Sequence, residues 1–154
     1  MLQCLWEQCM KVKVIEDKNL LETEIEIHCL KYDHEIEHIV SILEKYDQTI
    51  IGKRNNRSYV IKISDIYYME TIDSKTFLYV EDKIYESNMR LSQIEKQLLD
   101  TSFIRISKSM LLNVDKIENI KVIFNGRYEA ILMNQEKVII NRRYVSNLKK
   151  ILGL

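Results

Sequence analysis

Basic and hydroxyl side chains gather in two short segments of the last third of the chain. The first is residues 103–109, Phe-Ile-Arg-Ile-Ser-Lys-Ser, and the second is residues 141–144, Asn-Arg-Arg-Tyr. The planar guanidinium of arginine matches O6 and N7 of guanine in the major groove, and lysine reaches the same acceptors or a phosphate. Serine hydroxyls suit phosphate oxygens. The two segments therefore predict a surface that binds nucleic acid.

A different chemistry is suggested by residues 34–38, His-Glu-Ile-Glu-His, which match the His-Glu-x-x-His pattern of zinc hydrolases. On a helix, His34 and His38 lie on one side, and the apolar residues of the same stretch centre on the opposite side. A catalytic zinc needs a third ligand and an open position in a cleft, and His28 is the only other histidine. We therefore expect a solvated, acidic helix face and no metal site.

Other catalytic patterns are missing from the sequence. It contains no Gly-x-Gly-x-x-Gly run and no Gly-Lys-Ser/Thr loop, so no nucleotide phosphate site is indicated. All three histidines lie in the first 50 residues, which leaves the rest of the chain without a recognisable nucleophile and base. We expect a protein without catalytic residues or a cofactor.

Charge is divided unevenly along the chain. Residues 1–50 hold five Lys and eleven Asp or Glu, a net charge of −6, whereas the remaining residues hold 18 Lys or Arg and 12 acids, a net charge of +6. The formal net charge of zero for all 154 residues therefore conceals a basic part. Such asymmetry is expected when only one part of a protein meets phosphate.

The sequence also bears on the compartment. No run approaches the 18 or so apolar residues of a membrane-spanning helix, and the first ten residues lack the pattern of a signal peptide. The three cysteines, Cys4, Cys9 and Cys29, form no Cys-x-x-Cys pair, so reduced thiols are expected. We expect a cytoplasmic protein.

Residues 1–49 predict a small acidic β-β-α unit. Alternating apolar residues indicate strands at residues 12–15 and 24–30, and Asp33 can cap a helix that ends near Tyr46. About fifty residues bury too little apolar surface to be stable alone, so this unit should pack on the following domain or on a second copy. Met10 also fits a natural start, with residues 1–9 as an upstream extension.

From residue 50 the apolar period changes to two, which is typical of strands. We expect strands at residues 50–54, 59–63, 66–70, 77–81, 84–86, 110–114, 117–124, 128–132 and 137–140, with a helix at residues 90–99. Asn125-Gly126 predicts a type I′ hairpin turn, which needs positive φ at both residues. Asn141 can cap a closing helix. Residues 50–154 thus predict one mainly β, α+β domain.

Several of these features together resemble the LytTR DNA-binding domain of bacterial transcriptional regulators. They are residues 65–70, Asp-Ile-Tyr-Tyr-Met-Glu, the single inner helix, Asn113, and the segments 103–109 and 141–144. The resemblance covers residues 50–154. It implies an elongated fold of mainly antiparallel strands, with one inner and one C-terminal helix, whose loops enter successive major grooves of bent DNA.

The resemblance also implies which residues meet DNA. The reading elements would be the turn at residues 73–76, the segment 107–109 and the segment 141–143. Bases would be contacted by Lys108 and Arg143, assisted by Lys75 or Thr76. The DNA backbone would be contacted by Arg105, Ser107, Ser109, Asn141 and Arg142. Many relatives have His-Arg-Ser or His-Asn-Ser where this chain has Ser107-Lys-Ser109, so we expect a different sequence preference.

We accordingly expect a sequence-specific transcriptional regulator that binds direct repeats in double-stranded DNA as a homodimer. Fifty residues cannot form a receiver domain, so direct control by phosphorylation is not expected. The chain resembles small stand-alone LytTR regulators, some of which are paired with a membrane protein that restrains them. Residues 1–49 would then serve dimerisation or bind a membrane-bound inhibitor. The alternative is a protein-interaction module that keeps the fold without binding DNA.

Overall fold

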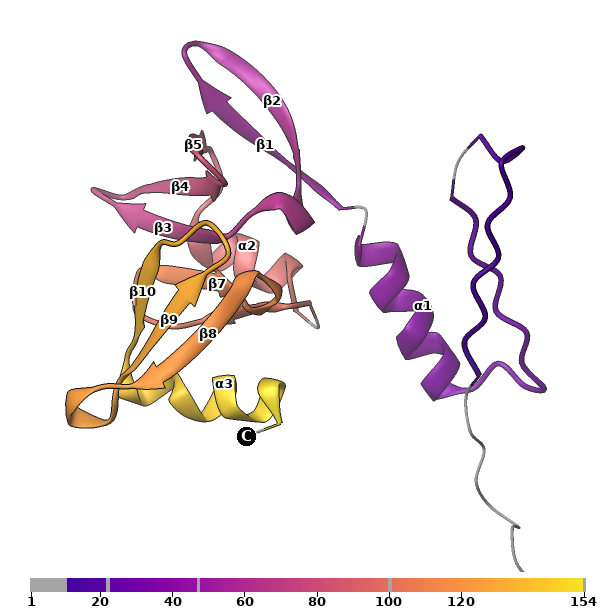
Figure 1. The fold of residues 1–154 in the computed structure, drawn as a ribbon. Helices are drawn as coiled ribbons and strands as arrows, with labels where there is room; N and C mark the ends of the chain where they lie inside the picture. Colours follow the sequence, from indigo (N-terminus) through magenta and orange to yellow (C-terminus); the bar gives the residue numbers. More distant parts are fainter. Residues whose placement is uncertain (1–10, 22, 47, 100, 154) are drawn as a thin grey trace, which may run out of the picture. The chain divides into compact units, whose positions relative to one another are not determined.

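The computed structural model describes residues 11–21, 23–46, 48–99 and 101–153. The possible start at Met10 and the first two cysteines lie outside these residues, whereas Cys29 is free and exposed. The chain divides into two units, Met1–Lys31 and Tyr32–Leu154 (Figure 1). The DNA-binding domain expected at residues 50–154 lies within the second unit, and its boundary after residue 49 stays a prediction.

The described residues of the first unit form no strand and no helix, and residues 18–19 make a turn. The strands predicted at residues 12–15 and 24–30 are therefore wrong. Both segments alternate in polarity, but their apolar side chains face solvent, with Val12 84% and Ile25 61% exposed. An isolated two-stranded ribbon is marginal in water unless one face is covered. No described residue of this unit supplies that cover.

Helix α1, His34–Tyr46, begins where it was predicted. The carboxylate of Asp33 accepts hydrogen bonds from the backbone N–H groups of Glu35, at 3.1 Å, and Ile36, at 3.2 Å, so the predicted cap is confirmed. His34 and His38 are exposed. The described residues contain no group of three or more His, Cys, Asp or Glu side chains that could hold a metal ion. None of their helices has the length and apolar character needed to cross a membrane.

A large and a small antiparallel sheet form the body of the second unit, which confirms the mainly β, α+β fold (Figure 1). The large sheet has the order β2-β1-β5-β4-β3-β7-β6 and contains β1 (Thr49–Arg54), β2 (Arg57–Lys62), β3 (Tyr68–Ile72), β4 (Lys75–Val80), β5 (Lys83–Ser87), β6 (Phe103–Arg105) and β7 (Met110–Asn113). The small sheet has the order β10-β9-β8 and contains β8 (Ile117–Val122), β9 (Tyr128–Leu132) and β10 (Lys137–Ile140). Two further helices are α2 (Leu91–Gln97) and α3 (Val145–Leu152).

Alternating residues of the central strands bury two separate cores. Met69 on β3 and Leu111 on β7 pack with the buried residues of α2, whereas their neighbours Tyr68 and Leu112 pack with the small sheet and α3. Successive side chains of a strand point to opposite faces of a sheet. The large sheet therefore lies between α2 on one face and the small sheet with α3 on the other.

Asn113, one of the landmarks of the resemblance, has a structural role. Its side chain is buried, and its Nδ2 donates to the backbone carbonyl of Ile66 at 3.0 Å. Its Oδ1 accepts from the backbone N–H of Asp115 at 3.1 Å. A buried backbone group without a hydrogen-bond partner costs about 1–3 kcal/mol. Asn113 therefore stabilises the place where the end of β7 lies beside the residues that lead into β3.

Several hairpin turns of this unit contain residues with positive φ, and two of them bear on the site or on the sequence prediction. Asp73 and Ser74, with φ of 49° and 66°, form the two-residue turn between the paired Ile72 and Lys75. The positive φ predicted for Asn125 and Gly126 is confirmed, at 63° and 69°. The loop is longer than the predicted two residues, because the backbone N–H of Ile123 donates to the carbonyl of Arg127 and leaves Phe124–Gly126 between them.

Candidate nucleic-acid interface

The three segments expected to read DNA lie next to one another. β3 and β7 run antiparallel with Glu70 opposite Met110, so the turn after β3 and the loop before β7 share one end of the large sheet. The backbone N–H of Thr71 donates to the carbonyl of Ser109 at 2.8 Å. The backbone N–H of Asn141 donates to the carbonyl of Ile106 at 3.0 Å. Backbone hydrogen bonds thus join the loop 107–109 both to the β3–β4 hairpin and to the segment 141–143.

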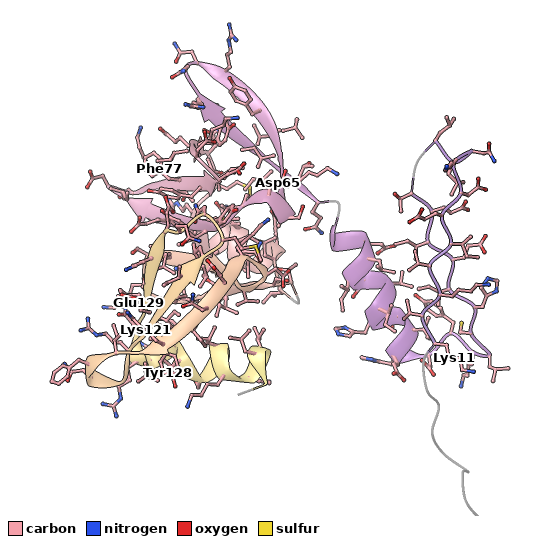
Figure 2. All side chains as sticks on the ribbon, in the orientation of Figure 1. Lys11, Asp65, Phe77, Lys121, Tyr128 and Glu129 are labelled. Carbon is pink, nitrogen blue, oxygen red and sulfur yellow. The ribbon has the colours of Figure 1, made fainter. Side chains whose placement is uncertain are left out.

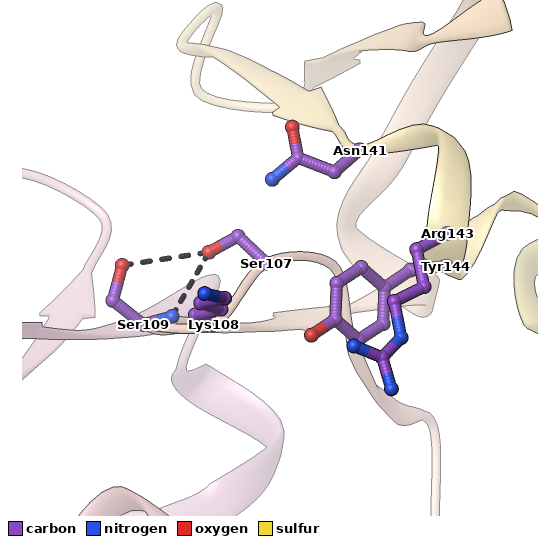
Figure 3. Close-up of a pocket in the computed structure, with 6 residues that line it drawn as sticks. All are labelled: Ser107, Lys108, Ser109, Asn141, Arg143 and Tyr144. Carbon is purple, nitrogen blue, oxygen red and sulfur yellow. Dashed lines mark hydrogen bonds between the residues drawn. The ribbon is translucent and has the colours of Figure 1, made fainter.

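The loop 107–109 has a fixed backbone. It is closed by a hydrogen bond from the N–H of Ile106 to the carbonyl of Met110, at 3.1 Å. Inside it, the hydroxyl of Ser107 accepts from the backbone N–H of Ser109 at 3.1 Å and lies 3.4 Å from the hydroxyl of Ser109 (Figure 3). This local bond is a common way for serine to stabilise a turn. Lys108 is exposed at the tip of this ordered loop.

Arg105 is held against the inner side of the same loop. Its Nη1 donates to the backbone carbonyl of Lys108 at 2.8 Å. Its Nε and Nη2 donate to the carboxylate of Glu95 on α2, with Nε 3.2 Å from each carboxylate oxygen. The Arg105 side chain is only 17% exposed. Its guanidinium, expected on the DNA backbone, is therefore engaged within the protein and connects α2 to the loop.

An open pocket of about 350 Å³ lies between the loop and the start of α3. Its lining consists of Ser107, Lys108, Ser109, Asn141, Arg143 and Tyr144 (Figure 3). Lys108 and Arg143, the two expected base readers, thus face the same pocket. Tyr144 was not expected there, although it stands in the Asn-Arg-Arg-Tyr segment that suggested the site. The two cations and three hydroxyls can bind an anionic ligand or the edges of bases.

The predicted cap at Asn141 is wrong. The chain first makes a 3-10 turn at Arg142–Tyr144, closed by a hydrogen bond from the N–H of Tyr144 to the carbonyl of Asn141, at 2.8 Å. Helix α3 starts only at Val145, and the Asn141 side chain makes no capping bond. Because the amide of Asn141 does not cap the helix, it is free to line the pocket.

The β3–β4 hairpin exposes only one of the two side chains that were expected to assist base contacts. Lys75 is exposed, and its Nζ forms an ion pair with Glu86 on β5 at 3.1 Å. An exposed pair of this kind is worth about 0–1 kcal/mol, so a phosphate or base can displace it. Thr76 is only 2% exposed, because its side chain lies on the same face of β4 as the core residue Leu78. From this position Thr76 cannot reach a base unless the strand moves.

Two groups of residues outside the pocket have shifted pKa values. Tyr68 and Tyr79 stack with ring centroids 4.1 Å apart. Burial, and then the negative charge of nearby Glu136 and Glu70, raises the pKa of both phenols, so they stay neutral. On β9, the ammonium of Lys121, whose Nζ lies 2.8 Å from the carboxylate of Glu129, lowers the pKa of that carboxylate. The negative charge of Glu129 is therefore compensated locally.

The amino-acid sequence is similar to those of bacterial DNA-binding and regulatory proteins. The family model of the LytTr DNA-binding domain matches residues 56–153. An uncharacterized HTH-type transcriptional regulator of Staphylococcus aureus is 27% identical over 147 residues, which cover 94% of this chain and 99% of the relative. The sensory transduction protein LytT of Enterococcus faecalis is 34% identical over 99 residues, 64% of this chain and 41% of LytT.

A solved structure agrees with the sequence matches. It is the LytTr DNA-binding domain of a putative methyl-accepting/DNA response regulator from Bacillus cereus, with a TM-score of 0.65 and 26% identity over 69% of this chain and 97% of that chain. The name of the Staphylococcus relative describes it as HTH-type, that is, helix-turn-helix. A helix-turn-helix joins two helices by a turn of three or four residues. Within the described part of this chain, strands separate α2 from both α1 and α3, so no such pair forms.

Proposed function

Because this chain belongs to the LytTR DNA-binding domain family, we propose that it is a transcriptional regulator that reads a specific sequence in double-stranded DNA. It acts in the cytoplasm and inserts the loop 107–109 and the segment 141–143 into the major groove. The observation that supports this proposal best is the shared pocket of Lys108 and Arg143, which stand on two backbone segments joined by the Asn141–Ile106 hydrogen bond. Because this hydrogen bond holds the two segments together before DNA binds, less conformational entropy is lost on binding.

The contacts divide into two kinds. Lys108 and Arg143 reach base edges, with Lys75 at the flank. The DNA backbone is contacted by Ser107, Ser109, Asn141 and Arg142, whose hydroxyl, amide and guanidinium groups suit phosphate oxygens. Arg105 positions the loop through the carbonyl of Lys108. Thr76 makes no contact because it is buried.

Fluorescence anisotropy of the full chain with the promoter of its own operon, from 50 to 200 mM salt, tests this function. Each phosphate contact releases counterions, so log affinity should fall linearly with log salt, with a slope of about −0.9 per contact. The promoter should bind about 10³-fold or more tightly than scrambled DNA of the same length. Equal affinity for both DNAs would instead support the protein-interaction module.

We also propose that the regulator binds direct repeats as a homodimer through its N-terminal segment, residues 1–49. The Staphylococcus match covers 94% of the chain, so it includes most of this segment. The described part of the segment exposes several apolar side chains, including Val12, Val14, Ile15, Leu21, Ile25 and Leu30. Burying each such side chain fully is worth about 1.5–3 kcal/mol, which is enough for a stable dimer when several are covered.

Sedimentation analysis of the full chain tests the dimer. The Val14→Asp/Ile25→Asp double variant should shift the wild-type dimer to monomer, with dimer dissociation raised at least about 100-fold, since charged side chains oppose burial. The control Lys18→Ala lies in the exposed turn of the same segment and should leave the dimer unchanged. A dimer that survives both aspartates would place the interface elsewhere. A monomeric wild type would leave this surface to a membrane-bound inhibitor.

A further inference from the structure

The turn between β8 and β9 lies beside Arg142, within the proposed DNA surface. A Cβ added at Gly126 would lie 3.5 Å from Cδ and 3.6 Å from Cγ of Arg142. The aliphatic part of the Arg142 side chain therefore lies beside the turn, with room for about one carbon atom between them. Figure 1 shows the same proximity, with the β8–β9 turn next to the start of α3.

The side chains of this turn are suited to DNA. Phe124 is 81% exposed, and Asn125 and Arg127 are exposed on either side of Gly126. The nearest acid along β9 is Glu129, which is paired with Lys121 on the neighbouring strand (Figure 2). The turn therefore presents an aromatic ring and an arginine, next to a second arginine, without an uncompensated negative charge from Glu129.

The order of contacts along DNA indicates what this turn would meet. A sugar-phosphate backbone separates the major groove from the minor groove. If Arg143 enters the major groove and Arg142 contacts the bounding backbone, a turn that flanks Arg142 would come within reach of that backbone and the adjoining minor groove. Apolar side chains that enter the minor groove commonly wedge against base steps and bend the duplex.

We propose that the β8–β9 turn is a further DNA-contacting element, in which Arg127 binds a phosphate and Phe124 enters the minor groove. The inference rests on the proposed function and extends it by one element outside the three that resemble the family pattern. The φ of 69° favours glycine at position 126, whereas a Cβ there would make only ordinary van der Waals contacts with Arg142.

Two single variants of the full chain test the inference by anisotropy on the promoter DNA at several salt concentrations. Arg127→Ala should lower the steepness of the salt dependence by about one unit and weaken binding to all DNAs about equally. Phe124→Ala should weaken binding about 10-fold without changing the salt slope, and should reduce the DNA bend measured by fluorescence energy transfer between labelled DNA ends. Both positions are exposed, so folding should be unaffected.

Arg57→Ala and Val60→Ala are the matched controls, because both residues are exposed on β2, the opposite edge strand from β6. They should bind as the wild type does. The inference is overturned if Phe124→Ala and Arg127→Ala also bind within twofold of the wild type while Lys108→Ala weakens binding. A wild type that does not prefer its promoter would overturn the proposed function and this inference together.

Discussion

Replacing both Lys108 and Arg143 by alanine is expected to abolish the preference for the operator and to leave the free energy of unfolding within about 0.5 kcal/mol of the wild type. Both side chains are exposed and line one pocket. A good base contact is worth about 1–3 kcal/mol of discrimination, so two of them amount to a loss of about 30- to 20,000-fold. Anisotropy with operator and scrambled DNA measures the effect.

The single variants separate base contacts from phosphate contacts. A base reader should lose discrimination at one position of the operator, whereas a phosphate contact should lower affinity for every DNA and reduce the salt slope by about one. Lys53→Ala, an exposed lysine on β1, controls for the loss of one charge. If the double variant keeps its operator preference, the assignment of Lys108 and Arg143 as base readers is wrong.

The sequence predicted β9 and β10 at their observed bounds and most other strands within two or three residues. Alternation was informative there because one face of each strand is buried in the domain itself. The same alternation at residues 24–30 gave a strand that does not form. A pattern of polar and apolar residues shows that one face could be buried but does not show what covers it, and the described residues of the N-terminal unit supply no cover.

The site could be predicted in part for a related reason. Lys108 and Arg143 follow strands, where side chains leave the sheet, and that position is visible in the sequence. The burial of Thr76 could also have been predicted from the sequence, because Thr76 is two residues from Leu78 and therefore shares its face of the strand. The ion pair of Arg105 with Glu95 could not be predicted from the sequence. Glu95 is on a helix, and only the packing of α2 against the large sheet brings the two side chains together.

Arg105→Ala is expected to lower both stability and DNA affinity, although we place Arg105 away from the DNA. The side chain of Glu95 is 37% exposed, so solvent screening limits the ion pair to at most about 1 kcal/mol. The hydrogen bond to the Lys108 carbonyl should add about 1 kcal/mol, giving an unfolding free energy lower by roughly 1–2 kcal/mol. Loss of the loop geometry should weaken operator binding about 10- to 100-fold, because misplaced contacts lose most of their discrimination. Urea unfolding and anisotropy measure the two effects.

The salt dependence distinguishes positioning from a direct phosphate contact. If Arg105 positions the loop, the slope of log affinity against log salt should stay at the wild-type value in Arg105→Ala, and Glu95→Ala should weaken binding in the same direction. Arg105→Lys should rescue only part of the affinity, since an ammonium cannot reproduce the fork that holds Glu95 and the Lys108 carbonyl together. A direct phosphate contact predicts the opposite pattern, in which the slope falls by about one, stability is unchanged and Glu95→Ala binds at least as tightly as the wild type. That outcome would mean that Arg105 contacts the DNA backbone, as the resemblance implies. The loop would then be fixed by its own serine and backbone hydrogen bonds alone.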